Sequence, residues 1–489
     1  MSLGTVDSWR LETRPGGAPW TEWQHFLVQL PDLHVLVNLS WDQALDGGRS
    51  IVVAWDGAWA GGVEVFRGGR VGIVPGRIDA RLGRTRLTFD GLRYHLHLRM
   101  DSGAVKADLS FTPTCDAVPS YNLKLGTRPM SWVQLPRLVV SGRIALNDRE
   151  HTLAGAPAYH DHNWGRFRWA DDFAWEWGTI APRESTSPWS FALLRTTDRG
   201  RRRLRDRVLY VFKEGRRARL FEPHQIRVRS PGTLTPPDQF TVPAAAHLLL
   251  PGALGDLPAD MTFSAQDGDD VLELRVVGRR LARIVIPEED GVGVVVINQV
   301  FVRGEAEGRI GGEDLQAEGS GVVEMIRGHR HPCSLADIPP RRRRTADGSL
   351  GSLLARALDR IERKQPEHCA AILGALGPLR VAVDCGAESF GFAADCVEDR
   401  GGDDGLPAWG TPLQGAGHDL CVRLDRRALR ALVGGELTLE QAIARRRVDV
   451  QGTVPDVLAL HRTVTSFVHA ALRTPGLEDL HRELMEERP

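Results

Sequence analysis

The sequence predicts a mainly β protein: two β units of similar size, followed by a separate α+β domain. Short apolar runs recur at fairly even spacing up to about residue 330, with turn signals between them, a pattern typical of barrels and sandwiches. The 52 Gly and 29 Pro suit frequent turns better than long helices. A chain of 489 residues also exceeds the roughly 250–300 residues at which single cores stop growing.

The first β unit is expected over residues 1–165. Residues 20–40 hold two apolar runs broken at Pro31-Asp32, which predicts two strands around a turn. Residues 92–100 alternate between apolar and polar side chains, as a half-buried strand does. Further strands are expected at residues 51–55, 63–66, 71–74, 104–113 and 133–144.

The second β unit is expected over residues 166–335, where the same pattern resumes. Strands are expected at residues 190–194, 208–212, 271–277, 282–286, 292–302 and 319–326. The basic run at residues 199–207 is interpreted as a solvated hairpin tip, because charge runs between strands usually face water.

The composition changes at Pro339, where a proline-led basic segment begins. We expect a linker and helix over residues 336–365, since Leu353, Leu354, Leu358 and Ile361 fall at helical spacing. Residues 366–489 then form the α+β domain. Its strands are expected near residues 379–384, 420–424 and 448–450, and its helices at 425–433, from 438 and at 456–472.

The overall charge and the cysteines limit the class of protein. A formal net charge of −1 gives no global attraction to nucleic acid or to an anionic membrane, although a peripheral membrane contact stays open. Neither a secretory signal nor a long apolar run is visible, and the six cysteines form no C-x-x-C pair. A cytoplasmic protein with free thiols is expected.

The most unusual stretch is Ala158–Gly165, which reads Ala-Tyr-His-Asp-His-Asn-Trp-Gly. In an extended strand, successive side chains point to opposite faces. One face is then expected to carry His160, His162 and Trp164, and the other Tyr159, Asp161 and Asn163.

The two histidines admit three interpretations: metal ligands, a proton-transfer pair or hydrogen-bonded structural groups. The H-x-H spacing suits a metal, but no third ligand presents itself. Proton transfer is attractive because the ordinary histidine pKa lies near ~6.5. The structural interpretation is about equally strong on chemistry alone.

Aromatic and acidic residues follow directly after the motif. Trp164, Trp169, Trp175 and Trp177 stand close together in the chain, where their rings could stabilise a cation or fill a junction between barrels. Glu176 would be a candidate acid if burial raised its pKa, and an ordinary surface residue otherwise. The same two alternatives hold for Glu324.

At these residues the sequence resembles the carotenoid 1,2-hydratase family and its AttH-like relatives. The motif is a tyrosine followed by His-Asp-His-Asn-Trp-Gly, at residues 159–165. Supporting matches are Trp132, Ser141-Gly142, residues 175–178 and residues 319–324. Over residues 10–330 the resemblance implies two lipocalin-like barrels with an elongated apolar cavity. It also implies acid-catalysed hydration of an alkene or, as in related proteins, cyclisation.

The resemblance carries over only in part. Among the hydratases, a His and a Trp that correspond to His162 and Trp164 matter for activity. The family also uses a Tyr and an Asp on the strand that follows, and residues 188–194 contain neither. The acid expected to protonate the alkene is therefore not where the hydratases hold it.

The C-terminal domain resembles the sterol carrier protein type two family. The matching segments are residues 422–425, 432–443 and 448–452, within a region of about 366–475. The resemblance implies an α+β fold with a hydrophobic tunnel for lipid and transfers no catalytic residue.

Together these observations predict acid/base-catalysed cyclisation, isomerisation or hydration of an alkene in a hydrophobic isoprenoid or polyene, without a cofactor or metal. His162 is expected to act as general acid or base, supported by His160 and Asp161. The residues expected to line the pocket are Tyr159, Trp164, Trp175, Glu176 and Trp177. The alternative is a carrier that binds lipid without changing it.

Overall fold

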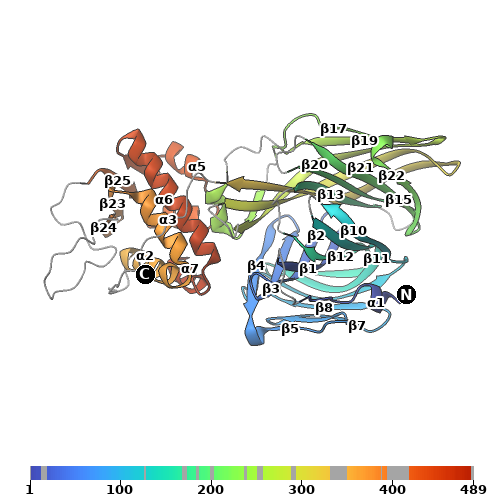
Figure 1. Cartoon of the computed structure of the whole chain (residues 1–489), viewed down its shortest axis with the longest axis horizontal. Coiled ribbons are helices and arrows are strands. Elements are labelled where there is room, and N and C mark those ends of the chain that lie inside the picture. The colour runs from blue at the N-terminus through green and yellow to red at the C-terminus, as the bar shows by residue number, and fades with distance from the viewer. Residues whose placement is uncertain are drawn as a thin grey trace. The chain divides into compact units, whose positions relative to one another are not determined.

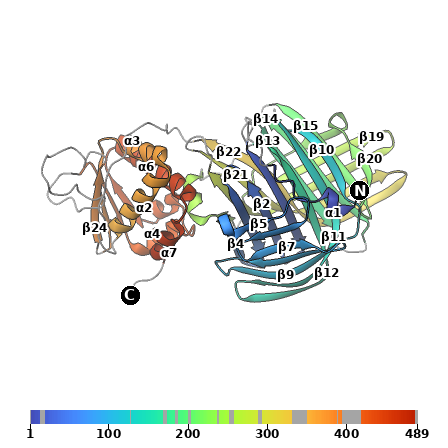
Figure 2. The ribbon, with the colours of Figure 1, turned by 60° about the horizontal axis from the view of Figure 1, so that its bottom comes forward.

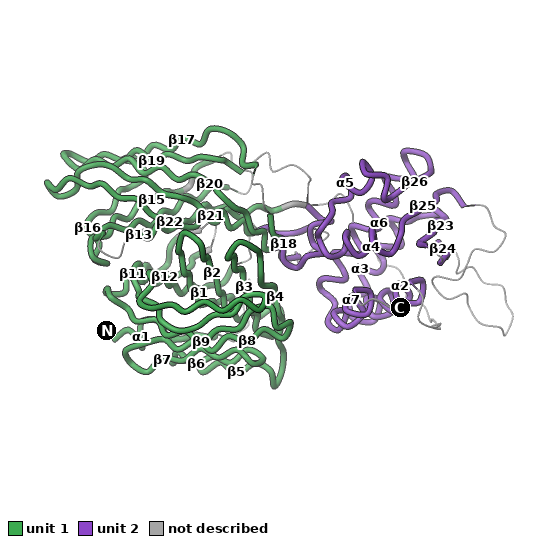
Figure 3. The backbone as a smooth tube through the Cα atoms, turned by 180° about the vertical axis from the view of Figure 1, so that it is seen from behind, with its two compact units in different colours: residues 1–240, 254–284, 297–328 green, residues 241–253, 285–296, 329–489 purple. Residues whose placement is uncertain are grey.

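The computed structural model describes residues 2–12, 19–125, 128–167, 173–182, 187–198, 203–235, 239–250, 257–287, 293–330, 350–386, 388–393 and 418–485. Trp169, residues 199–202 of the basic run and residues 336–349 of the expected linker lie outside these ranges. The chain divides into two compact units (Figure 3). The first unit comprises residues 1–240, 254–284 and 297–328, and the second comprises residues 241–253, 285–296 and 329–489.

The first unit begins with an antiparallel sheet that curls into a nearly closed barrel (Figure 1). Within the described ranges it has twelve strands in the order β4-β3-β2-β1-β12-β11-β9-β8-β7-β6-β5, with β10 paired to β11. The strands are β1 (Trp20–Gln29), β2 (His34–Asp42), β3 (Gly47–Trp55), β4 (Trp59–Arg67), β5 (Val71–Ile73), β6 (Asp79–Leu82), β7 (Thr85–Phe89), β8 (Tyr94–Arg99), β9 (Val105–Pro113), β10 (Val118–Leu125), β11 (Arg128–Leu146) and β12 (Arg149–Arg166). A short helix, α1 (Leu3–Val6), precedes them.

A second antiparallel barrel follows in the same unit (Figure 2). Its order over the described strands is β16-β15-β14-β13-β22-β21-β20-β19-β17, with β18 paired to β20. The strands are β13 (Phe173–Pro182), β14 (Trp189–Asp198), β15 (Leu204–Lys213), β16 (Arg216–Phe221), β17 (Ile226–Arg229), β18 (Gln239–Val242), β19 (Asp260–Asp267), β20 (Asp270–Pro287), β21 (Gly293–Ile310) and β22 (Glu313–Arg330). The mainly β architecture with two barrels is therefore confirmed.

Strands of the first barrel differ in whether one or both of their faces are buried, and the strands buried on both faces lie where the candidate site is found. Strand β8 alternates, with Tyr94, Leu96 and Leu98 buried in the core, as a strand with one wet face does. Strand β1 is buried at every position. One face of β1 packs in the first core, and the other meets the second barrel, where His25 touches the ring of Trp177. The motif strand β12 lies next to β1.

The second unit is α+β, as expected. Its sheet has the order β24-β23-β25-β26, with β23 and β25 parallel. The elements are α2 (Leu350–Lys364), α3 (Pro366–Leu376), β23 (Arg380–Cys385), β24 (Glu388–Ala393), β25 (Leu420–Leu424), α4 (Arg426–Val433), α5 (Leu439–Ala444), β26 (Val448–Gln451), α6 (Val454–Arg473) and α7 (Glu478–Met485). Helices α3 and α7 were not foreseen from the sequence. No helix in these ranges is both long and apolar enough to cross a membrane.

Two helix starts in this unit follow directly from the sequence. Asp425 caps α4 by accepting a hydrogen bond from the Ala428 amide at 2.5 Å. Thr438 and Gln441 form a reciprocal capping box at the start of α5, which satisfies backbone N–H groups that lack partners within the helix.

Candidate active site

Strand β12 presents two different sets of side chains, as its alternation predicts. His160 and Trp164 face the core of the first barrel, where the His160 ring stacks on Phe26 with centroids 4.2 Å apart. His162 lies on the same side, 4.7 Å from the Trp164 ring. Tyr159 faces the second barrel, and its ring centroid lies 5.5 Å from that of Trp177.

The inner face holds a buried charge network. His160 Nε2 lies 3.0 Å from Asp7 Oδ2, and His162 Nδ1 lies 3.2 Å from Asp7 Oδ1. His162 Nε2 lies 2.8 Å from Glu22 Oε1, and these side chains are fully enclosed. Burial alone would lower the pKa of His162, but hydrogen bonds and charge from Asp7 and Glu22 raise it to about 9. Burial opposes ionisation of Asp7, yet the two imidazoles hold its pKa well below the usual range.

This network attaches the N-terminal segment to the barrel. The Glu22 carboxylate also accepts hydrogen bonds from the Arg10 amide at 2.7 Å, the Leu11 amide at 2.8 Å and the Trp20 indole at 3.0 Å. The Tyr94 hydroxyl donates to Asp7 over 2.6 Å. The Glu22 carboxylate therefore accepts three hydrogen bonds besides the one from His162. These surroundings are those of a charged histidine with a structural role.

The outer face carries a different carboxyl group. Asp161 accepts hydrogen bonds from the Tyr159 hydroxyl at 3.1 Å and the Asn163 amide at 2.6 Å. Burial raises the pKa of Asp161 to about 8, with a contribution from the Glu324 carboxyl, and the hydrogen bond from Tyr159 only partly opposes the rise. Burial therefore favours the protonated form of Asp161. It was expected to support His162, but the carboxylates bonded to the imidazoles are those of Asp7 and Glu22.

Asp161 stands in the middle of a row of polar side chains. Its register partners are His25 on β1 and Gln134 on β11, and directly opposite residues have Cβ atoms about 4.5–5.5 Å apart. His25 Nε2 and both polar atoms of the Gln134 amide are buried without a hydrogen-bond partner. Burial, with a smaller effect of His160, lowers the pKa of His25 to about 3, so its ring is neutral.

The second barrel covers this row with aromatic and acidic groups. The Trp177 ring lies 5.8 Å from His25 and 6.4 Å from Trp132, centroid to centroid. Its register partner Glu324 accepts a hydrogen bond from the Trp175 indole at 2.7 Å. Burial raises the pKa of Glu324 to about 7. Two buried carboxyl groups of raised pKa thus occur where the barrels meet.

Two residues expected in the same pocket lie elsewhere. Glu176 points away from its neighbouring tryptophans and pairs with Arg195 at 2.7 Å and Arg327 at 3.2 Å. It therefore does not line the site beside Trp175 and Trp177. Trp164 belongs to the inner face, where the Arg10 guanidinium lies 5.1 Å from its ring centroid.

Sequence reasoning missed most of the partners. Asp7, Glu22, His25 and Gln134 were not singled out, because each is a lone polar residue in a segment without a motif. One signal was available: residues 20–29 place Glu22, Gln24 and His25 in a strand-like run, so polar groups occupy both of its faces. A strand buried on both faces that still carries polar side chains on each must supply partners for them.

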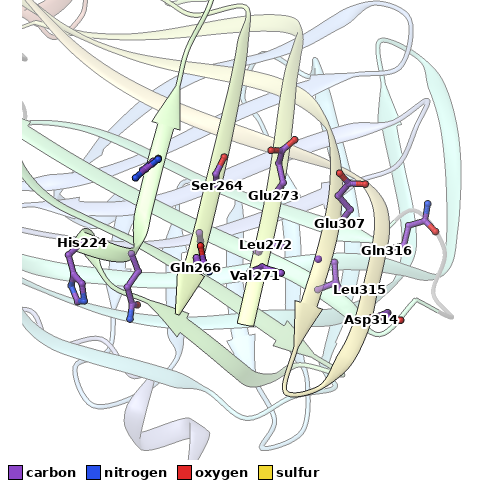
Figure 4. Close-up of a pocket in the computed structure, with 14 residues that line it drawn as sticks. His224, Ser264, Gln266, Val271, Leu272, Glu273, Glu307, Asp314, Leu315 and Gln316 are labelled. Carbon is purple, nitrogen blue, oxygen red and sulfur yellow. The ribbon is translucent and has the colours of Figure 1, made fainter. Parts of the chain in front are cut away.

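A hollow lies away from the motif, on the second barrel (Figure 4). It measures about 980 Å³, and Ser264, Glu273 and Glu307 project into it from neighbouring strands (Figure 4). None of the motif residues lines it, and its polar walls differ from the apolar cavity that the resemblance implies. Over the described ranges, no group of three or more His, Cys, Asp or Glu side chains is arranged to hold a metal ion.

Comparisons with known proteins identify distant structural neighbours. No family model and no curated protein matches the chain. Similar solved structures include kievitone hydratase from Nectria haematococca, at 12% identity and a TM-score of 0.45, covering 67% of this chain and 96% of that one. CghA with Sch210972 shows 11% identity, a TM-score of 0.45 and coverage of 66% and 97%. A putative AttH from Nitrosomonas europaea shows 14% identity, a TM-score of 0.43 and coverage of 66% and 98%.

Proposed function

We propose that this protein catalyses a proton-driven step on an alkene of a hydrophobic isoprenoid or polyene, where the two barrels meet. The observation that carries the proposal is Asp161, a buried carboxyl group with a pKa of about 8. It is hydrogen-bonded to Tyr159, whose ring contacts Trp177 of the second barrel. A general acid is most effective when its pKa lies near the working pH, and Asp161 meets that condition.

Each part of the chemistry has a candidate group. Asp161 gives its proton to one alkene carbon, which leaves a carbocation on the neighbouring carbon. The faces of Trp132 and Trp177 stabilise the cation, each by about 0.5–2 kcal/mol. Capture by water and loss of a proton from the resulting oxonium ion give hydration, attack by a second alkene followed by proton loss gives cyclisation, and direct proton loss gives isomerisation. Glu324, with a pKa of about 7, is the group suited to accept that proton.

The proposal moves the acid role from His162 to its neighbour. On the inner face, His162 is hydrogen-bonded to Glu22 and lies within ion-pair distance of Asp7, so it holds the strand that presents Asp161. The alternative function is a carrier, favoured by the absence of the hydratases' Tyr and Asp from residues 188–194. For the second unit we propose binding of an apolar ligand, on its resemblance to sterol carrier proteins alone.

Mass spectrometry after incubation with acyclic polyenes tests the proposal. Wild type is expected to give a product that has gained one water, or an isomer of altered retention. Asp161→Asn removes the acidic proton of the side chain but preserves the side chain's size and shape. It should lower turnover at least about a hundredfold. Asp108→Asn, at an exposed carboxylate on β9, is the matched control. Full turnover by Asp161→Asn excludes this acid, and unchanged polyene from all three proteins supports the carrier.

A further inference from the structure

Several buried polar atoms around Asp161 have no hydrogen-bond partner. Among the side chains that the structure describes there, these atoms include His25 Nε2, the amide nitrogen and oxygen of Gln134, Trp132 Nε1, Trp177 Nε1 and Gln299 Oε1. The other end of the Gln299 amide donates to Glu324, so its orientation is fixed. A group of this kind at one place is unusual, because most buried polar atoms in folded proteins are paired.

Three of these side chains lie close to the proposed acid. Gln134 and His25 flank Asp161 across the sheet, one on each neighbouring strand. Trp177 extends from the second barrel toward these residues, and its ring contacts the rings of His25 and Tyr159. Both donors and acceptors are present: the indole N–H donates, and the Gln134 amide can do either.

A pure hydrocarbon would leave these groups unsatisfied when it entered the site. An unpaired buried polar group loses its hydration without compensation, which disfavours a hydrocarbon relative to a ligand that carries oxygen. The charged residues near the site also determine whether the oxygen group of the ligand can be ionised. The row contains neither lysine nor arginine to balance the charge of an anion, so the matching group is neutral.

We propose that the substrate carries a neutral oxygen function, a carbonyl or a hydroxyl, bound by Gln134 and Trp177 beside Asp161. This inference rests on the proposed function, because it takes the meeting face of the barrels as the reactive site. A carbonyl oxygen accepts from the Gln134 amide and the Trp177 indole, and a hydroxyl can also donate to the Gln134 carbonyl. Gln134 and Trp177 are thus residues that determine specificity, and the alkene that receives the proton lies close to the oxygen.

Three probes with one carbon skeleton test this: farnesal, farnesol and β-farnesene. Dissociation constants come from tryptophan fluorescence titrations of the full chain. Wild type is expected to bind farnesal and farnesol at least about tenfold more tightly than β-farnesene, the effect of one or two satisfied hydrogen bonds. Gln134→Leu should reduce that ratio several-fold, because one of the two hydrogen-bonding groups is lost and the hydrocarbon no longer meets an unpaired amide. Gln316→Leu, at an exposed site, should keep the wild-type ratio.

Equal affinity of wild type for the three probes, failure to bind farnesal, or an unchanged ratio in Gln134→Leu overturns the inference. If Gln134→Leu does not fold, Trp177→Phe provides the same comparison, since it removes the indole N–H and keeps an aromatic ring. Turnover separates the inference from the proposed function. Preference for farnesal without any product keeps the inference and removes the catalytic role, whereas turnover of β-farnesene at equal affinity does the reverse.

Discussion

His162 donates through Nε2 to the Glu22 carboxylate over 2.8 Å, and both side chains are fully buried. His162→Ala leaves Glu22 and Asp7 without this cation, and removing one partner of a buried ion pair costs about 3–5 kcal/mol. We expect the free energy of unfolding, from urea titration at pH 7, to fall by that amount. His97→Ala, at an exposed pair with Asp108, should cost less than about 1 kcal/mol. Equal effects of the two substitutions would contradict a structural role for His162.

The same ion pair makes stability depend on pH. The folded-state pKa of His162 is about 9, against 6.5 ordinarily, so its contribution is complete below pH 6.5 and is lost as the pH rises through 9. The urea midpoint of wild type should therefore decrease between these values. His162→Gln, which cannot titrate, should show a flatter profile, and parallel profiles would exclude His162 as the cause.

Asp161→Asn should stabilise the protein at alkaline pH. The folded-state pKa of Asp161 is about 8 and its ordinary value is 3.8, so the folded state binds the extra proton between them. Stability then falls as the pH rises through this window, with a slope of up to about 1.4 kcal/mol per pH unit. Asparagine removes that slope. Urea titrations at pH 5 and pH 8 should show the variant gaining on wild type at the higher pH, and a constant difference would refute the raised pKa.

Turnover should decline on the alkaline side. Asp161 acts as an acid only while protonated, so the rate is expected to fall as the pH rises through about 8. Product formation measured across this range, on protein shown to be folded at each pH, gives the profile. A rate that rises through pH 8 would identify a base as the essential group.

Glu176 should matter for stability and not for chemistry. Its ion pairs with Arg195 and Arg327 lie on the face of β13 opposite Trp177. Glu176→Ala should cost about 3–5 kcal/mol in unfolding free energy and leave turnover unchanged while the protein is folded. Glu318→Ala, which breaks an exposed pair with Arg303, should change neither quantity much. A large loss of turnover in folded Glu176→Ala would return this residue to the active site.

The sequence predicted features that are local in the chain. Period-two alternation predicted the two faces of residues 159–164, and helical spacing predicted a helix where α2 lies. Helix caps gave the starts of α4 and α5. Register between strands could not be predicted, because it depends on pairing across the barrel, including a shift between Leu135 and Leu138. His25 and Gln134 reach Asp161 only through that register, and Asp7 joins His160 across 153 positions of sequence.

Strand β12 contributes side chains to two separate regions. Its even-numbered motif residues lie inside the first barrel, and its odd-numbered ones point toward the second barrel. The two sets can therefore change independently over evolution. Substitutions at Tyr159, Asp161 or Asn163 can alter the reaction without disturbing the charges that anchor the strand. Such a strand is a scaffold on which new chemistry can arise while the barrel keeps its fold.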